Sequence, residues 1–163
     1  MAPDLQQVRL EDLSDVRYSF WIGKHPGKQY PRDVLVIRFE GTYRIGSEGN
    51  PDAAFMVAIG NAGVYAFNPD AIITDLSALT YEWGDEMAGV MDIGCDRRNK
   101  PTSLVVGSNC RQAIGTLCFG VNSTNDACER ESIFDSLDDA WKYVTKLLDE
   151  ERTWDDLLGP KDI

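Results

Sequence analysis

The most informative stretch of this chain runs Ala71-Ile72-Ile73-Thr74-Asp75-Leu76-Ser77-Ala78-Leu79-Thr80-Tyr81-Glu82-Trp83-Gly84-Asp85-Glu86-Met87-Ala88-Gly89-Val90-Met91. Its first residues form an apolar run of strand length, which Asp75-Leu76-Ser77 closes. After a loop, Met87, Val90 and Met91 recur at the spacing of one helix face. The stretch therefore predicts a strand that leads through a loop into a helix, which is half of a βαβ crossover.

The pattern resembles the signature of the STAS family, which includes the anti-anti-sigma factors and the cytoplasmic tails of sulphate transporters. The resemblance rests on Asp75-Leu76-Ser77 with the downstream helix, and on a second segment, Phe134-x-Ser136-Leu137-x-x-Ala140. It covers residues 34–148. It implies an α/β fold, a STAS-like mixed β-sheet of about five strands with about four helices and with the N-terminal hairpin strand at the edge. It also implies a protein that binds partner proteins.

The loop between the strand and the helix departs from the family pattern. Family members often carry a phosphorylated serine or threonine in this loop. Here Trp83-Gly84-Asp85-Glu86 occupies the loop, and either Gly84 or Asp85 stands where the hydroxyl would be. The resemblance therefore implies the fold and a binding role but no phosphorylation switch.

The remaining elements follow from apolar patterns and turn residues. Strands are expected at 16–22, 34–39, 102–106 and 131–134. A first helix is expected to begin at Pro51 and to end near residues 60–63, where glycines favour a C-cap. Residues 107–109 open a third helix, and Ser136 caps a fourth, strongly amphipathic one.

The chain of 163 residues is expected to form one domain. We predict a flexible N-terminal arm or a short turn over 1–14, a single STAS-like α/β domain over 15–148, and an acidic C-terminal tail over 149–163. The tail carries Trp154, which suits either a docked short helix or a segment that binds a partner.

The formal net charge of −11 argues against binding to nucleic acids or anionic membranes, because both require a basic surface. Between Ile45 and Asp96 the sequence has acidic residues but no lysine or arginine. This segment is either a solvated acidic face or a surface complementary to a basic partner. No apolar stretch approaches the roughly 20 residues of a membrane span, and the first residues lack the pattern of a secretory signal. We therefore expect a cytoplasmic protein.

Residues for catalysis are scarce. His25 is the only histidine, and no nucleophile motif lies near it. The spacings of Cys95, Cys110, Cys118 and Cys128 match no zinc or redox pattern. We expect no enzymatic activity, no cofactor and no metal.

Three functions remain open for the sequence. The leading hypothesis is a non-catalytic interaction module that binds a protein partner, with a basic surface, through Glu82, Trp83, Gly84, Asp85 and Glu86. A second is an immunity or antitoxin-type inhibitor of a basic toxin or nuclease. The third, with least support, is an enzyme that uses Asp85 and Glu86, together with Asp92 or Asp75, to hold a divalent metal. The acids are explained equally well by the positive dipole end of the helix that begins there.

Overall fold

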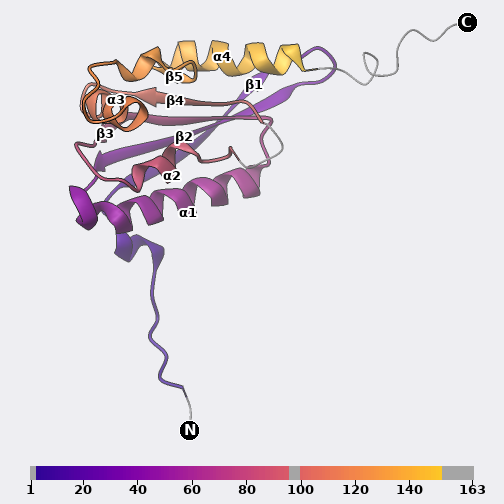
Figure 1. Cartoon of the computed structure of the whole chain (residues 1–163). Coiled ribbons are helices and arrows are strands. Elements are labelled where there is room, and N and C mark those ends of the chain that lie inside the picture. The colour runs from indigo at the N-terminus through magenta and orange to yellow at the C-terminus, as the bar shows by residue number, and fades with distance from the viewer. Residues whose placement is uncertain (1–2, 96–99, 152–163) are drawn as a thin grey trace, which may run out of the picture.

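The computed structural model describes residues 3–95 and 100–151. Within them, five strands form one sheet whose order follows the chain, β1-β2-β3-β4-β5 (Figure 1). The sheet contains β1 (Arg17–His25), β2 (Arg32–Thr42), β3 (Ala71–Thr80), β4 (Thr102–Val106) and β5 (Ile133–Phe134). β1 is antiparallel to β2, and every other neighbouring pair is parallel. The mixed sheet with the hairpin strand at its edge confirms the expected fold class.

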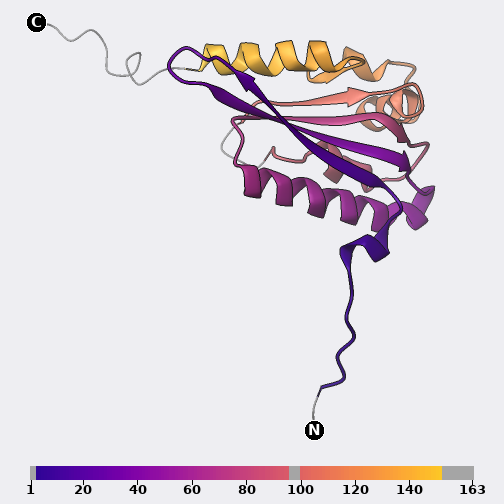
Figure 2. The same ribbon diagram turned by 180° about the vertical axis from the view of Figure 1, so that it is seen from behind.

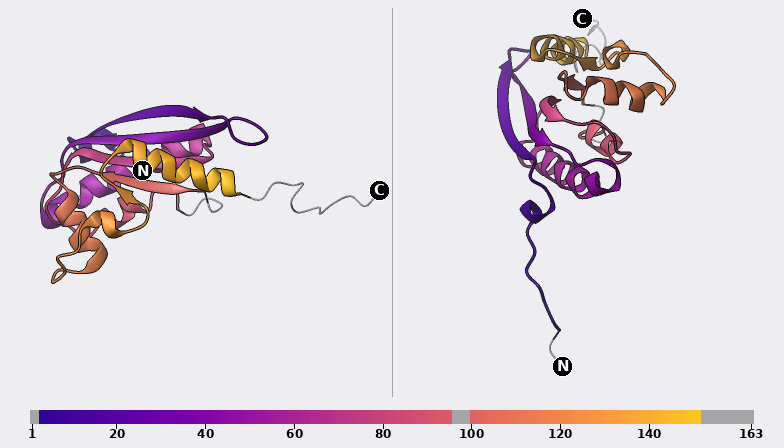
Figure 3. Two further views of the ribbon diagram at one scale, coloured as in Figure 1. Left: turned by 90° about the horizontal axis from the view of Figure 1, so that it is seen from above. Right: turned by 90° about the vertical axis from the view of Figure 1, so that its left-hand side faces the viewer.

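Four α-helices and three short 3-10 helices accompany the sheet in the described part of the chain. The α-helices are α1 (Asn50–Phe67), α2 (Met87–Met91), α3 (Arg111–Phe119) and α4 (Leu137–Glu150). The 3-10 helices are η1 (Leu10–Leu13), η2 (Gly46–Gly49) and η3 (Ala127–Glu129). Successive parallel strands step in one direction, so right-handed crossovers bring α1, α2 and α3 to the same face of the sheet. Among the described helices, α4 alone covers the other face (Figures 1 and 3).

Two apolar layers hold these elements together. Along β2, Leu35 and Ile37 face the layer shared with α1, α2 and α3, whereas Val34 and Val36 face α4. On the α4 side the helix contributes Ala140, Val144 and Leu148. A central strand buried on both faces needs an almost continuous apolar sequence rather than an alternating one. This is why short apolar runs located the strands correctly.

β3 is longer than its sequence indicated. It continues to Thr80 instead of closing at Asp75-Leu76-Ser77. The pairing with β2 shifts register between Arg38 and Glu40, and beyond this irregularity Leu79 is again fully buried. The polar residues therefore mark an irregularity within the strand rather than its end.

The first helix is also longer than predicted, because its glycines serve packing and not a C-cap. A Cβ atom on Gly60 would lie 2.5 Å from Ile93, and one on Gly63 would lie 2.4 Å from Phe20. The helix continues past both glycines to Phe67. The C-cap is Asn68, which adopts the left-handed conformation with φ 43°.

The segments predicted as an N-terminal arm and a C-terminal tail each include residues that belong to the folded domain. Asp149 and Glu150, which we expected in the tail, belong to the last turn of α4. The rest of the tail from residue 152, including Trp154, lies outside the described residues. Within the predicted arm, residues 3–9 have no helix or strand and extend away from the domain (Figure 2). By contrast, Ser14 donates a hydrogen bond of 2.6 Å to the carboxylate of Asp52.

Over residues 3–95 and 100–151, the structure has no helix long and apolar enough to cross a membrane. The four cysteines are free thiols. Cys110 is buried, and burial raises the pKa of its thiol.

Candidate functional site

The predicted site residues lie in the loop that connects β3 to α2, which we call the acidic loop (residues 82–86). This loop leaves the carboxyl edge of the parallel strands, where open α/β sheets usually bind their ligands. It lies beside the turn between β4 and α3, because the amide of Tyr81 donates a hydrogen bond of 3.1 Å to the carbonyl oxygen of Asn109.

Two buried tyrosines support the loop from below. The Tyr81 hydroxyl donates a hydrogen bond of 2.6 Å to the carbonyl oxygen of Gly84. The Tyr43 ring meets the Tyr81 ring edge to face, with 5.2 Å between the centroids. Gly84 has φ +155°, and a Cβ atom there would lie 3.0 Å from the Tyr43 ring. Gly84 is therefore required by conformation and packing.

Trp83 is held at its backbone and exposed at its side chain. Its carbonyl oxygen accepts a hydrogen bond of 3.0 Å from the amide of Gly46 in η2. The indole rests against Gly46, where a Cβ atom would lie 2.7 Å from Cζ3 of the ring. The tryptophan nevertheless remains 56% exposed. The loop thus presents one large aromatic side chain, and the backbone that carries it is held by a hydrogen bond.

Glu82, Asp85 and Glu86 are exposed in the same loop as this tryptophan, whereas Gly84 is buried. Burial raises the pKa of Tyr43 to about 12, and the charges of Asp52, Glu86 and Asp85 contribute to the rise. Burial likewise raises the pKa of Tyr81 to about 12, with smaller contributions from Tyr43 and Asp85. Both phenols are therefore neutral near pH 7. The acidic loop therefore carries negative charge, whereas the two tyrosines that support it are uncharged.

One polar atom in this support is not satisfied. The Tyr43 hydroxyl is buried and has no hydrogen-bond partner among the residues that the structure describes. An unpaired buried hydroxyl costs stability.

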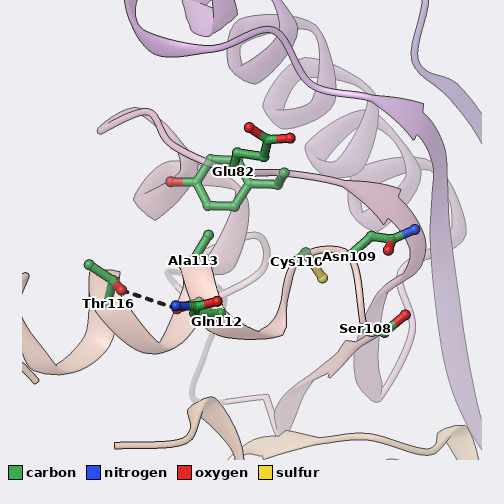
Figure 4. Close-up of a pocket in the computed structure, with 8 residues that line it drawn as sticks. Glu82, Ser108, Asn109, Cys110, Gln112, Ala113 and Thr116 are labelled. Atoms are coloured by element: carbon green, nitrogen blue, oxygen red, sulfur yellow. Dashed lines mark hydrogen bonds between the residues drawn. The ribbon is translucent and has the colours of Figure 1, made fainter. Parts of the chain in front are cut away.

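A cavity of about 320 Å³ opens next to the acidic loop (Figure 4). Tyr81 and Glu82 line it from the β3 side, and the turn before α3 and the first turns of that helix line it from the other. The lining residues on the α3 side are Ser108, Asn109, Cys110, Gln112, Ala113 and Thr116. The cavity is thus mostly polar and uncharged, with the carboxylate of Glu82 as its one charged group.

These residues at the start of α3 were not predicted as part of the site, because they lie more than twenty positions further along the chain than the acidic loop. The sequence does contain one indication that the two segments are close. Residues 107–109 follow a predicted parallel strand, and the carboxyl ends of neighbouring parallel strands meet at the same edge of a sheet.

His25 lies away from this edge and has a structural partner. It is the last residue of β1 rather than part of the following loop, and its Nε2 lies 2.9 Å from a carboxylate oxygen of Asp149. His25 pairs with Arg32, the first residue of β2, and so lies at the amino edge of the parallel strands. The contact ties the hairpin to the end of α4.

In the described part of the chain, no group of three or more histidines, cysteines and acids has an arrangement that could hold a metal ion. The predicted binding residues are consecutive and four of the five are exposed. Their role in binding is still a prediction.

Comparison with known proteins gives matches in structure but none in sequence. No family model matches the chain, and no curated protein matches it by sequence. The crystal structure of an anti-sigma factor antagonist from Mycobacterium paratuberculosis superimposes with a TM-score of 0.50 and 21% sequence identity. The match covers 79% of this chain and 95% of that one. The chain therefore has the fold of an anti-sigma factor antagonist, the STAS-type architecture that its sequence resembles.

Proposed function

We propose that this chain is a non-catalytic interaction module of STAS type, and that it binds a protein partner with a basic surface through the acidic loop. The observation that carries the proposal is the position of Trp83. Its indole is 56% exposed, and the side chains of Glu82, Asp85 and Glu86 in the same loop are exposed as well. Exposed aromatic side chains are frequent anchors of protein interfaces. Surrounding charges steer an oppositely charged partner and select it.

The support of the loop favours binding as well. Gly84 is fixed by the Tyr81 hydroxyl and Trp83 by the Gly46 amide. A loop that is already ordered loses less conformational entropy when a partner binds. The buried tyrosines therefore contribute to affinity without touching the partner.

The lack of a serine or threonine in the acidic loop is consistent with a binding site that does not depend on phosphorylation. Residues 82–86 contain no serine or threonine, and Asp85 and Glu86 present fixed negative charge where family relatives gain it by phosphorylation. The structural neighbour is named as an anti-sigma factor antagonist, a protein defined by what it binds, which supports a binding role.

The net charge of −11 also supports the second function, an inhibitor that blocks the cationic cleft of a toxin or nuclease. The two proposals use the same surface and differ in the partner. A regulatory protein recovered with the chain would support the first, and a basic effector enzyme would support the second.

The test begins with capture of the partner, followed by titration calorimetry at two salt concentrations. The variant Asp85→Asn/Glu86→Gln should weaken binding about tenfold or more, with the larger loss at low salt. Its fold should lose only about 0.3–1 kcal/mol per carboxylate. Trp83→Ala should weaken binding by a similar factor.

A matched control removes the same two types of charge elsewhere. Asp138→Asn/Glu131→Gln changes one exposed aspartate and one exposed glutamate near the start of α4. This variant should bind almost as the wild type does. Equal affinity of the wild type and both loop variants would show that the acidic loop is not the binding surface.

A further inference from the structure

We propose that β1 is a self-pairing edge, through which two copies of this chain join their sheets into one. The inference does not depend on the proposed function, because it uses none of the residues of the acidic loop.

The first observation is the backbone of β1. This strand is at the end of the sheet and pairs on one side only, with β2. Its pairing is continuous over nine residues, from Arg17 opposite Glu40 to His25 opposite Arg32, with neither a bulge nor a proline. The outer side of β1 is therefore a long, regular row of backbone donors and acceptors without strand partners in the described structure. Edges of this kind pair readily with another chain.

The other edge of the described sheet offers no comparable surface. It is formed by β5, which has two residues, Ile133 and Phe134. A strand so short presents few free hydrogen-bonding groups, which is one way in which proteins protect an edge. The contrast points to β1 as the edge available for pairing.

The second observation is the set of side chains along β1. Trp21 is 63% exposed, Ile22 45% and Tyr18 41%. Trp21 lies on the α4 face of the sheet, whereas Tyr18 and Ile22 lie on the α1 face. Apolar surface is therefore exposed on both faces of the free edge. A second sheet placed alongside would cover it on both faces.

The aromatic surface on the α1 face is larger than these exposures indicate. The Tyr18 ring lies 5.5 Å from that of Phe20 and 5.9 Å from that of Phe55. Phe20 in turn contacts the ring of Phe67, which is itself 44% exposed. Aromatic residues are enriched at protein interfaces.

Charge favours a second copy as the occupant. A chain with a net charge of −11 repels itself over most approaches, but β1 carries Arg17 and Lys24 and no acid. The two cations already have partners on β2, in Glu40 and Asp33. Two copies can therefore approach each other along this strand without placing acidic side chains of one β1 opposite those of the other.

The sequence of β1 is also complementary to itself. In an antiparallel pair centred on Phe20, this residue stands opposite Phe20 of the second copy, and Tyr18 stands opposite Ile22. Arg17 then faces Gly23, so that no like charges are opposed. This register keeps α1-face residues opposite α1-face residues, as the two-fold axis of such a pair requires.

The test is sedimentation velocity of the full chain over a range of concentrations. The wild type should change from monomer to dimer as concentration rises. Ile22→Lys places a charge opposite Tyr18 of the second copy and should raise the dimer dissociation constant about tenfold or more. Circular dichroism verifies that the variant is folded.

Val121→Lys is the matched control. Val121 is 80% exposed in the turn after α3, so its replacement adds the same charge outside the edge. This control should dimerise as the wild type does. A wild type that stays monomeric up to about 1 mM, which corresponds to about −4.1 kcal/mol of association, would overturn the proposal. So would a dimer that Ile22→Lys leaves unchanged.

Amide hydrogen exchange identifies the surface that pairs. Protection of residues 17–25 should increase with concentration in the wild type and in Val121→Lys, but not in Ile22→Lys. Protection gained at another surface would overturn the proposal. The proposal would also be overturned if the β1 amides that point away from β2 were protected equally at all concentrations. A segment of the same chain would then occupy the edge.

Discussion

The Tyr81 hydroxyl donates a hydrogen bond to the carbonyl oxygen of Gly84, three residues further along the chain, at 2.6 Å. The bond spans the segment that contains Glu82 and Trp83. A buried side chain that directly follows β3 is thus hydrogen-bonded to the backbone of the exposed loop.

Replacement of Tyr81 by Phe should remove this bond and leave the packing against Tyr43 in place. The Gly84 carbonyl would lose its buried donor, and the free energy of unfolding should fall by about 1 kcal/mol. Amides of residues 82–86 should exchange faster, because the loop can open locally. Tyr30→Phe is a suitable control, since Tyr30 is 55% exposed. Unchanged exchange in the loop of Tyr81→Phe would show that the bond does not restrain it.

Gly46→Ala should displace the indole of Trp83. The new Cβ would lie 2.7 Å from the ring, and the residue has φ +64°. The indole N–H signal of Trp83 in an NMR spectrum should shift, and binding of a partner to the acidic loop should weaken. Part of any stability loss, about 1 kcal/mol, comes from the positive φ alone.

Gly120→Ala separates these two effects. Gly120 has φ +96°, but a Cβ atom there would have no atom within 4 Å. This variant should lose stability through backbone strain and leave the Trp83 signal in place. If both variants moved the signal equally, the contact between Gly46 and Trp83 would not be its cause.

Trp141→Ala should lower the free energy of unfolding, measured with denaturant, by about 3 kcal/mol. This value is near the lower limit for large aromatic residues, because the Trp141 side chain is half-buried. The ring tip packs on Gly23 of β1, where a Cβ atom would lie 2.4 Å from it. Gly23→Ala should therefore cost about 1–3 kcal/mol by crowding. The double variant should lose less than the sum of the two. A loss under about 0.5 kcal/mol for Trp141→Ala would show that this contact does not stabilise α4 on the sheet.

Asp52 should make stability depend on pH in acid. Burial alone would raise the pKa of this carboxyl, but hydrogen bonds from Arg44 and Ser14 outweigh it, and the pKa lies below the ordinary 3.8. A depressed folded-state pKa contributes stability above the unfolded value, which is lost as the pH falls through the folded value.

Asp52→Asn should therefore lower the free energy of unfolding by about 2 kcal/mol near pH 7, because Arg44 keeps its charge without a charged partner. The loss is not larger because Arg44 is partly solvated. The difference between wild type and variant should shrink as the pH falls below about 3.8. Urea unfolding at several pH values measures it. A difference that is the same at all of them would contradict the assigned role of the carboxylate.

Much of the fold was predictable from sequence because its central strands are buried on both faces. Leu104, Val105 and Val106 stand in a short apolar run that only a central parallel strand explains well, and β4 has the expected bounds. Ser136 likewise caps α4 as expected, by accepting a hydrogen bond from the amide of Asp139.

Features that depend on distant contacts were not predictable. Gly60 and Gly63 look like helix terminators until Ile93 and Phe20 are brought against them. The support of the acidic loop by Tyr43 is of the same kind, because Tyr43 comes from the end of β2 and nothing local to it indicates this role.

The order of the strands in the sheet has a consequence for synthesis of the protein. Each strand pairs with the one made just before it, so the sheet can grow by addition at one edge while the chain leaves the ribosome. Among the described elements, α4 follows the five strands and is the one that covers the second face over Val36, Ile73 and Val105. A nascent chain halted before residue 137 would expose that apolar face, and it is at this stage that the protein most needs a chaperone.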